Sequence, residues 1–233
     1  MATILNIETS AAVCSVALTA EGMILTHKED FEGRNHATLL SGFIKHCIDY
    51  ARDHEMKLDA VAVSMGPGSY TGLRIGLSEA KGLAYALDIP LIGIDTLKLL
   101  TTRVMFSGEE FEPDTVFIPM VDARRMEVYT AAYDFALETV MKPQALILDE
   151  NSYKDILSSG RPVLYFGSGA EKARPVFENT PSARYIEGIE ALAVDMIALA
   201  EMAYMRRDFI DTAYSTPAYL KDFQATTPKN KVL

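Results

Sequence analysis

Short apolar runs alternate with polar turns at the start of the chain, which predicts a meander of three strands. The runs cover residues 3–7, 13–18 and 23–27. A helix is predicted next, over residues 36–54, because apolar side chains such as Leu40 recur there every three or four positions. The opposite side of this helix is polar, so we expect one face to pack against the sheet.

Strands and helices alternate in the segment that follows. The pattern predicts strands at 60–65 and 91–94, and each is followed by a helix, at 71–87 and at 96–106. Pro90 marks the end of the first of these helices. The order of elements is therefore βββαβαβα, which favours a mixed sheet with crossover helices.

A weaker copy of the same order follows a polar stretch at residues 107–114, which has the composition of a linker. The elements predicted after it are strands at 115–121, 127–133, 145–148, 163–166 and 184–186, and helices at 153–158, 170–178 and 190–207. We therefore expect an α/β protein of two tandem lobes, residues 1–106 and 107–233, with a cleft between them. The tail from residue 214 is assigned to the second lobe and is expected to be strand-like or loose.

Composition narrows the class of protein. The chain has 233 residues and a formal net charge of −10, which argues against binding nucleic acid by itself, because that affinity comes mainly from Lys and Arg. Its two cysteines, Cys14 and Cys47, form no CxxC pair, as is typical of a reducing compartment. With neither a basic leader nor an apolar run of membrane-spanning length, a soluble, cytoplasmic protein without membrane contact is predicted.

Glycines are concentrated in the segment from residue 61 to residue 87, where a strand, a tight turn and a helix follow one another. The turn, Gly66 to Gly72, reads GPGSYTG. Such a turn ahead of a helix can bind a phosphate, but its glycine spacing matches neither phosphate fingerprint and no lysine follows. An N-cap at Ser69 or Thr71 explains the hydroxyl side chains instead.

The glycines inside the predicted helix need a separate explanation, because each costs about 1 kcal/mol relative to alanine. On the side that faces the core, Gly76 and Ala80 would let another backbone approach closely. A second set of side chains, Ile75, Gly82 and Ala86, faces outward, and we call it the outer strip. We expect the outer strip to contact a helix of another subunit. Tight packing within the monomer is the alternative.

The same segment resembles the signature of the bacterial TsaB (YeaZ) family, which serves the threonylcarbamoyladenosine modification of tRNA. The resemblance rests on GPGSYTGLRIG from Gly66, AKGLA from Ala80, ILNIETS from Ile4, VDARRMEVY from Val121 and PAYLK from Pro217. It extends over almost the whole chain. It implies two lobes of the actin-like, Hsp70-like ATPase fold, also called the ASKHA or RNase H-like class, in agreement with the duplicated pattern.

The resemblance also implies a scaffold without catalytic residues of its own. In that family the catalytic paralogue TsaD transfers a threonylcarbamoyl group to N6 of adenosine 37 in tRNAs reading ANN codons. TsaB pairs with TsaD through the first two helices of its first lobe, here 36–54 and 71–87, and the ATPase TsaE joins the assembled pair. For this chain the resemblance implies a homodimer alone, a heterodimer with TsaD and indirect contact with tRNA.

A degenerate nucleotide site is implied at the ends of two strands. In actin-like ATPases a carboxylate there faces the Mg-phosphate group, and Glu8 and Asp122 take these places. Arg124 and Arg125 replace the paralogue's glycine-rich phosphate loop, so contact with ATP or ADP and Mg is expected only in the complex. An ion pair between Asp122 and Arg124 is the structural alternative. The alternative function is an autonomous actin-like ATPase or phosphotransferase that uses Glu8 and Asp122.

No metal site is expected, because the paralogue's His-x-x-x-His pair has no counterpart after the strand at 91–94 and all four histidines precede residue 55. The segment 167–170 corresponds to the paralogue's adenosine contact, although a plain strand-to-helix turn explains it equally well. No Ser/His/Asp or Cys/His arrangement is evident in the sequence.

Overall fold

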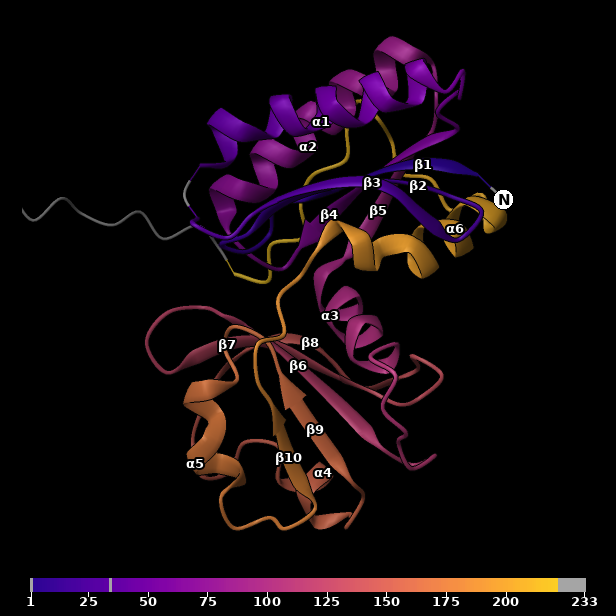
Figure 1. The fold of residues 1–233 in the computed structure, drawn as a ribbon. Coiled ribbons are helices and arrows are strands. Elements are labelled where there is room, and N and C mark those ends of the chain that lie inside the picture. Colours follow the sequence, from indigo (N-terminus) through magenta and orange to yellow (C-terminus); the bar gives the residue numbers. More distant parts are fainter. Residues whose placement is uncertain (1, 34, 222–233) are drawn as a thin grey trace, which may run out of the picture.

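Two five-stranded mixed sheets make up the computed structural model, which describes residues 2–33 and 35–221 (Figure 1). The strand order is β3-β2-β1-β4-β5 in the first sheet and β8-β7-β6-β9-β10 in the second. In each sheet the first three strands are antiparallel and the last two join in parallel. The two lobes therefore share one topology, which confirms the predicted duplicated fold of the actin-like class.

The first sheet carries its two long helices on one face (Figure 1). Its strands are β1 (Thr3–Glu8), β2 (Cys14–Ala20), β3 (Met23–Asp30), β4 (Ala60–Gly66) and β5 (Leu91–Asp95). The helices are α1 (His36–Asp53) and α2 (Tyr70–Leu87). Leu40 and Ile44 of α1 and Leu77 of α2 are buried in one apolar cluster with the sheet residues Leu5 and Val63. The predicted amphipathic face of α1 is thus the face that covers the sheet.

The second sheet is covered by much shorter helices. Its strands are β6 (Val116–Asp122), β7 (Glu127–Tyr133), β8 (Thr139–Ile147), β9 (Val163–Phe166) and β10 (Ala183–Ile186). The short helices are α4 (Lys154–Ser158), η1 (Glu171–Ala173) and α5 (Arg174–Phe177). Strand β8 begins well before the predicted start at residue 145. The sequence pattern does not reveal its first half, because most of its side chains are exposed and show no apolar alternation.

The last helix returns to the first sheet. The predicted helix at 190–207 is a 3-10 turn, η2 (Ala193–Met196), followed by α6 (Ile197–Arg206). The turn η2 packs against β1 and β2, and α6 packs against β1 and β5. Met196 and Ala200 are buried in one cluster with Ile4 of the first sheet. This differs from the expected assignment of 107–233 to the second lobe, because burying the apolar side of α6 requires the uncovered face of the first sheet. Residues 222–233 of that assignment lie outside the described residues.

Helix α3 (Thr96–Met105) lies between the two sheets (Figure 1). Its N-cap is Asp95, which accepts a hydrogen bond from the backbone N–H of Lys98 at 2.9 Å. Leu97 and Leu100 of α3 share one buried cluster with Ile92 of the first sheet and Phe117 of the second. The two lobes are therefore joined by a continuous apolar core. Among the described helices, none combines the length and the apolar character needed to cross a membrane.

Candidate functional site

Glu8, the last residue of β1, is completely buried. Its Oε1 accepts a hydrogen bond from the backbone N–H of Ser10, whereas Oε2 has no partner in the described part of the chain. Burial raises the pKa of this carboxyl, and the hydrogen bonds from Ser10 and Ser64 oppose the shift only in part. A raised pKa favours the neutral acid, which is a poor ligand for Mg²⁺.

The glycine turn ahead of α2 closes over the end of β1. A Cβ atom at Gly68 would lie 2.3 Å from the carbonyl oxygen of Ser10, and one at Gly72 would lie 2.1 Å from that of Thr9. The backbone N–H of Ser69 donates to the same Ser10 oxygen at 2.6 Å. Glycine is therefore required here because two backbones touch. The turn therefore packs against Thr9 and Ser10, on the side where a phosphate-binding turn would hold its ligand.

The side chain of Ser69 caps α2, as one of the two predicted N-caps, and accepts a hydrogen bond from the N–H of Gly72 at 3.2 Å. One turn further along the helix, a Cβ at Gly76 would lie 2.2 Å from Oγ1 of Thr9. The close approach predicted on the inner side of α2 thus occurs within the monomer, against the loop after β1.

Asp122 ends β6, the strand that corresponds to β1 in the second lobe, and about half of its side chain is exposed. Its Oδ1 accepts a hydrogen bond from the backbone N–H of Arg124 at 2.9 Å and pairs with the ammonium group of Lys172. The side-chain ion pair considered between Asp122 and Arg124 is not the contact that forms. Lys172 is the cation, and it also donates to the carbonyl oxygen of Arg125 at 2.8 Å.

Arg124 and Arg125 form the turn between β6 and β7 with exposed side chains. Both have left-handed backbone angles, with φ of 70° and 50°, which only glycine adopts without cost. Their backbones carry the turn, since the N–H of Glu127 donates to the carbonyl oxygen of Arg124 at 3.1 Å. The turn is thus held by backbone hydrogen bonds, while the side chains of both arginines are exposed.

The outer strip on α2 is only partly buried. Gly82 and Ala86 are exposed, and a Cβ at Gly82 would meet no atom within 4 Å. Ile75 is half-buried and packs against the core of the first lobe. The neighbouring helix α1 contributes Gly42, which is also exposed and has open space at its Cβ position. Nothing in the spacing of α1 singled out Gly42, because a lone glycine carries no pattern.

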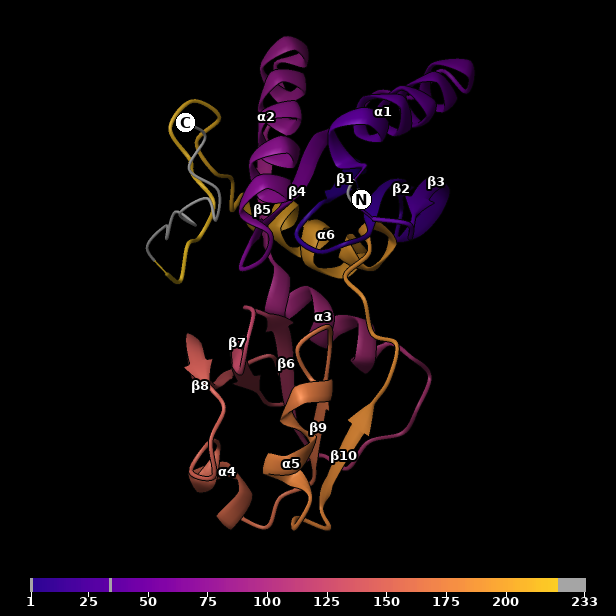
Figure 2. The ribbon, with the colours of Figure 1, turned by 90° about the vertical axis from the view of Figure 1, so that its left-hand side faces the viewer.

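Helices α1 and α2 lie together on the first lobe and diverge away from the sheet (Figure 2). A hydrogen bond links them on the solvent side, where Ser41 Oγ donates to Oε1 of Glu79 at 2.7 Å. We call the exposed side of these two helices, marked by Gly42, Gly82 and Ala86, the helix face. It has small side chains on both helices and no covering element among the described residues.

Comparison with known proteins identifies the family. A family model described as TsaD, tRNA N6-adenosine threonylcarbamoyltransferase, matches residues 28–229. The chain is 32% identical over 181 residues to the tRNA threonylcarbamoyladenosine biosynthesis protein TsaB of Bacillus subtilis (strain 168), and the match covers 76% of each chain. This chain belongs to the TsaB (YeaZ) family.

Further relatives of the TsaB family agree in sequence and in structure. The Escherichia coli (strain K12) TsaB is 33% identical over 130 residues, which cover 56% of this chain and 54% of that one. A crystal structure of a Pseudomonas aeruginosa protein with similarity to YeaZ superposes with a TM-score of 0.75 at 25% identity, over 95% of this chain and all of that one. A structure described as YeaZ from the same organism gives a TM-score of 0.71.

The two strand ends of this TsaB-family chain do not fit a Mg-nucleotide. The carboxyl of Glu8 is inaccessible, and the glycine turn packs on residues 9 and 10. The charge of Asp122 is matched by Lys172. In residues 2–33 and 35–221, no three His, Cys, Asp or Glu side chains lie close enough together to hold a metal ion.

The segment 167–170 is a turn that braces the end of β6. Gly167 has a φ of 98°, and a Cβ there would lie 2.4 Å from the carbonyl oxygen of Met120. The hydroxyl of Ser168 accepts a hydrogen bond from the backbone N–H of Asp122 at 3.2 Å. These contacts agree with the interpretation as a plain turn.

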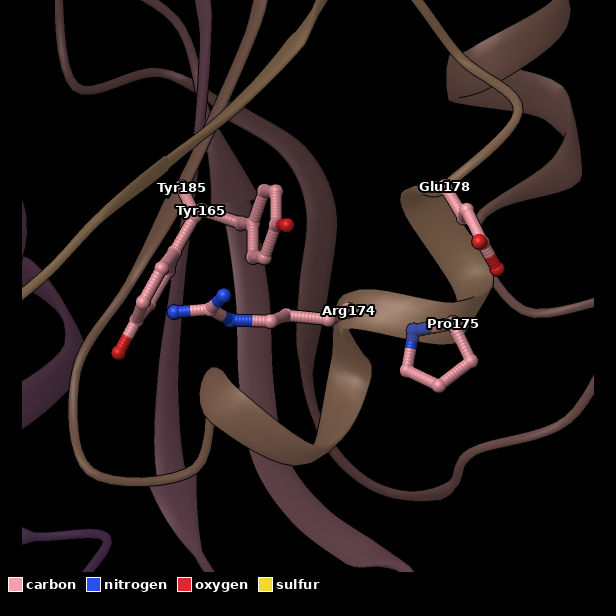
Figure 3. A pocket seen from close by; sticks show the side chains of 5 residues that line it. All are labelled: Tyr165, Arg174, Pro175, Glu178 and Tyr185. Carbon is pink, nitrogen blue, oxygen red and sulfur yellow. The ribbon is translucent and has the colours of Figure 1, made fainter.

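A depression of about 380 Å³ lies on the second lobe, away from every predicted site residue (Figure 3). The guanidinium of Arg174 extends into it beside the rings of Tyr165 and Tyr185, and its centre is 4.6 Å from the Tyr185 ring centroid. Arg174 also pairs with Glu171 at 3.0 Å. The charged group in the depression, the guanidinium of Arg174, therefore already contacts Tyr185 and Glu171 of the same lobe.

Proposed function

We propose that this chain is a non-catalytic scaffold subunit of the bacterial assembly that forms N6-threonylcarbamoyladenosine at position 37 of tRNAs reading ANN codons. It would pair with the catalytic subunit TsaD and activate it, with TsaE joining the assembled pair. Family membership supports the pathway. The observation that carries the scaffold role is the helix face. Gly42 of α1 and Gly82 of α2 lie on it, and no described residue outside the same helix lies within 4 Å of a Cβ atom built at either glycine.

Exposed helical glycines lower helix stability by about 1 kcal/mol each relative to alanine. Gly72 and Gly76 are explained by contacts within the monomer, but Gly42 and Gly82 are not. Close approach of another helix would explain both, because small side chains let helix backbones come together. The chain would form a homodimer when TsaD is absent.

The proposed role assigns no reaction to this chain. Glu8 is buried with a raised pKa, and Asp122 is paired with Lys172, so neither is arranged to hold Mg²⁺. ATP or ADP with Mg would therefore bind only in the assembled complex, with Arg124 or Arg125 as its contacts from this chain. The net charge of −10 supports contact with tRNA through the partners rather than through this subunit. We propose that the assembly acts in the cytoplasm.

The scaffold role is tested with Gly82→Arg and the matched control Gly82→Ala. Arginine places a long side chain on the helix face, whereas alanine adds one methyl group to open space. We expect the arginine variant to bind purified TsaD at least about tenfold more weakly and to lose the modified nucleoside in a complementation strain. The alanine variant, which adds only a methyl group, should weaken binding much less and keep the modification. Equal binding of TsaD by both variants would refute the assignment of the face.

A second variant, Ile75→Asp, probes the half-buried end of the outer strip. Because Ile75 also packs against the core of the first lobe, its circular dichroism spectrum and melting temperature are recorded before TsaD binding is measured. Loss of binding in a folded Ile75→Asp variant supports the proposal. Wild-type affinity in the folded variant counts against it.

The alternative of an autonomous ATPase rests on the matching positions of Glu8 and Asp122 at the ends of β1 and β6. Isothermal titration of the isolated chain with ATP and Mg²⁺ separates the two functions. The scaffold proposal expects no binding at micromolar concentrations. Micromolar binding that disappears in Asp122→Ala would establish the ATPase alternative.

A further inference from the structure

The segment after α6 leaves the first sheet and runs along α2 toward the second lobe, where it is the yellow segment beside α2 in Figure 2. It starts with a turn in which Oδ1 of Asp211 accepts hydrogen bonds from the backbone N–H groups of Ala213 and Tyr214, at 2.7 and 2.6 Å. We call residues 211–221 the strap. No regular secondary structure holds it, so its position depends on individual contacts.

The strap is fixed to the side of α2 at two points, Ala213 and Tyr219. Nζ of Lys81 donates to the carbonyl oxygen of Ala213 at 3.0 Å, and Nε of Arg74 donates to the hydroxyl of Tyr219 at 3.1 Å. The ring of Tyr219 also packs against that of Tyr70, with centroids 5.1 Å apart. These contacts use the side of α2 next to the helix face, so the strap borders that face without covering it.

The middle of the strap is hydrogen-bonded to the glycine turn. The backbone N–H of Ala218 donates to the carbonyl oxygen of Met65 at 2.7 Å. A Cβ at Gly66 would lie 3.1 Å from the carbonyl oxygen of Ala218, and the neighbouring Pro217 is buried. The strap therefore packs backbone to backbone on the turn from which α2 starts.

The lower end of the strap reaches the second lobe. The ammonium group of Lys221 pairs with Oε2 of Glu127, the first residue of β7. These side chains are 33% and 17% exposed, so the pair is less solvated than an ordinary surface ion pair. Through Glu127 the strap is joined to the turn that carries Asp122 and Arg124.

We propose that the strap is a clasp between the lobes. It connects the glycine turn at the end of β4 in the first lobe to the β6–β7 turn in the second, the two loops that border the cleft expected of an actin-like fold. While the clasp is closed, it limits the motion of the lobes about α3 and holds the turn on which α2 begins. Opening of the Lys221–Glu127 pair releases both. This clasp goes beyond the scaffold role and does not rest on it.

The clasp is tested on the isolated chain by charge reversal and charge exchange. In Lys221→Glu, hydrogen exchange should become about fivefold faster at the amide of Ala218 and in the peptide covering residues 65–72. A change of about fivefold corresponds to the upper end of the stabilisation measured for exposed ion pairs. The double variant Lys221→Glu with Glu127→Lys should restore the wild-type rate. Lys142→Glu, an equal charge change on exposed β8, is the control and should leave both rates unchanged.

A distance measurement distinguishes a clasp between lobes from a local loop anchor. Spin labels on cysteines introduced at exposed Lys57 and Lys154 report one position in each lobe, and the native Cys14 and Cys47 are buried. We expect the distance distribution to broaden in Lys221→Glu and to narrow again in the double variant. Faster exchange of Ala218 with an unchanged distance distribution would overturn the clasp, as would unchanged exchange.

Discussion

At the scale of single residues, Glu8 is a buried carboxyl group at the end of a strand. Its carboxyl ends β1, where the resemblance places a metal-facing carboxylate, yet it is buried and keeps one oxygen without a partner among the described residues. Burial raises its pKa above the ordinary value of 4.5. The folded chain therefore holds this proton more tightly than the unfolded chain does.

This shift has a predicted effect on stability. Because the folded pKa is raised, Glu8 stabilises the fold most below pH 4.5, and this contribution falls as the pH rises toward the folded pKa. Glu8→Gln keeps an acceptor for the N–H of Ser10 and carries no charge. We expect the free energy of unfolding of the wild type, relative to Glu8→Gln, to fall with increasing pH by at most about 1.4 kcal/mol per pH unit.

Urea unfolding of both proteins between pH 4 and pH 8 gives this difference. The other buried acids with raised pKa, Asp95 among them, cancel because both proteins contain them. A difference that stays constant over this range would mean that the pKa of Glu8 is not raised.

At the scale of elements, α2 uses glycine for two different purposes on its two sides. Gly72 and Gly76 face Thr9, where a side chain would collide with the loop after β1, while Gly82 faces open space. The same residue type is therefore needed for folding at one end of the helix and not at the other. Only the second use points to an unoccupied surface.

Two alanine substitutions test this distinction. Gly82→Ala should raise the free energy of unfolding by about 0.5 to 1 kcal/mol, because alanine favours the helix and meets no neighbour. Gly72→Ala should lower it by more than 1 kcal/mol, because its Cβ would lie 2.1 Å from the backbone oxygen of Thr9, which cannot move aside without shifting β1. Thermal unfolding measures both, and effects of equal sign would contradict the assignment.

At the scale of the whole molecule, the two lobes are not independent units. Helix α3 contributes Leu97 to a buried cluster that includes Ile4 of the first sheet and Phe166 of the second. The chain also crosses back to the first lobe with α6. Because each lobe completes the core of the other, we expect them to unfold together.

Leu97→Ala tests this shared core. Leu97 is fully buried, so its truncation should cost about 2 to 5 kcal/mol and lower the single melting transition without splitting it. Leu87→Ala, the same change at a residue that is 47% exposed, should cost about 0.5 kcal/mol or less. Differential scanning calorimetry follows the transition, and two separate heat-absorption peaks in the wild type or in Leu97→Ala would show that the lobes unfold independently.

The sequence predicted the elements of this fold more reliably than their grouping. Strands such as β1 and β4 carry buried apolar runs, and α1 has a clear amphipathic period, so both could be located from local pattern. Strand β8 was placed too late, because a strand with exposed side chains has no apolar alternation. Helix α6 was assigned to the wrong neighbours in space, because its apolar side does not say which sheet it will cover.

By itself, then, the sequence determined the duplicated α/β order and the glycine-rich helix, because apolar periods and turn residues depend on neighbours along the chain. Its motifs, such as GPGSYTGLRIG from Gly66, carried the resemblance to the family. Tertiary structure decided the contacts between distant residues. It brought Lys172 to Asp122 and Lys221 to Glu127, and it buried Glu8 at the end of β1. The two ion pairs join residues 50 and 94 positions apart, and the hydrogen bond from the backbone N–H of Thr9, next to Glu8, to Ser64 spans 55 positions. No period in the sequence encodes such separations, so only the folded chain defines them.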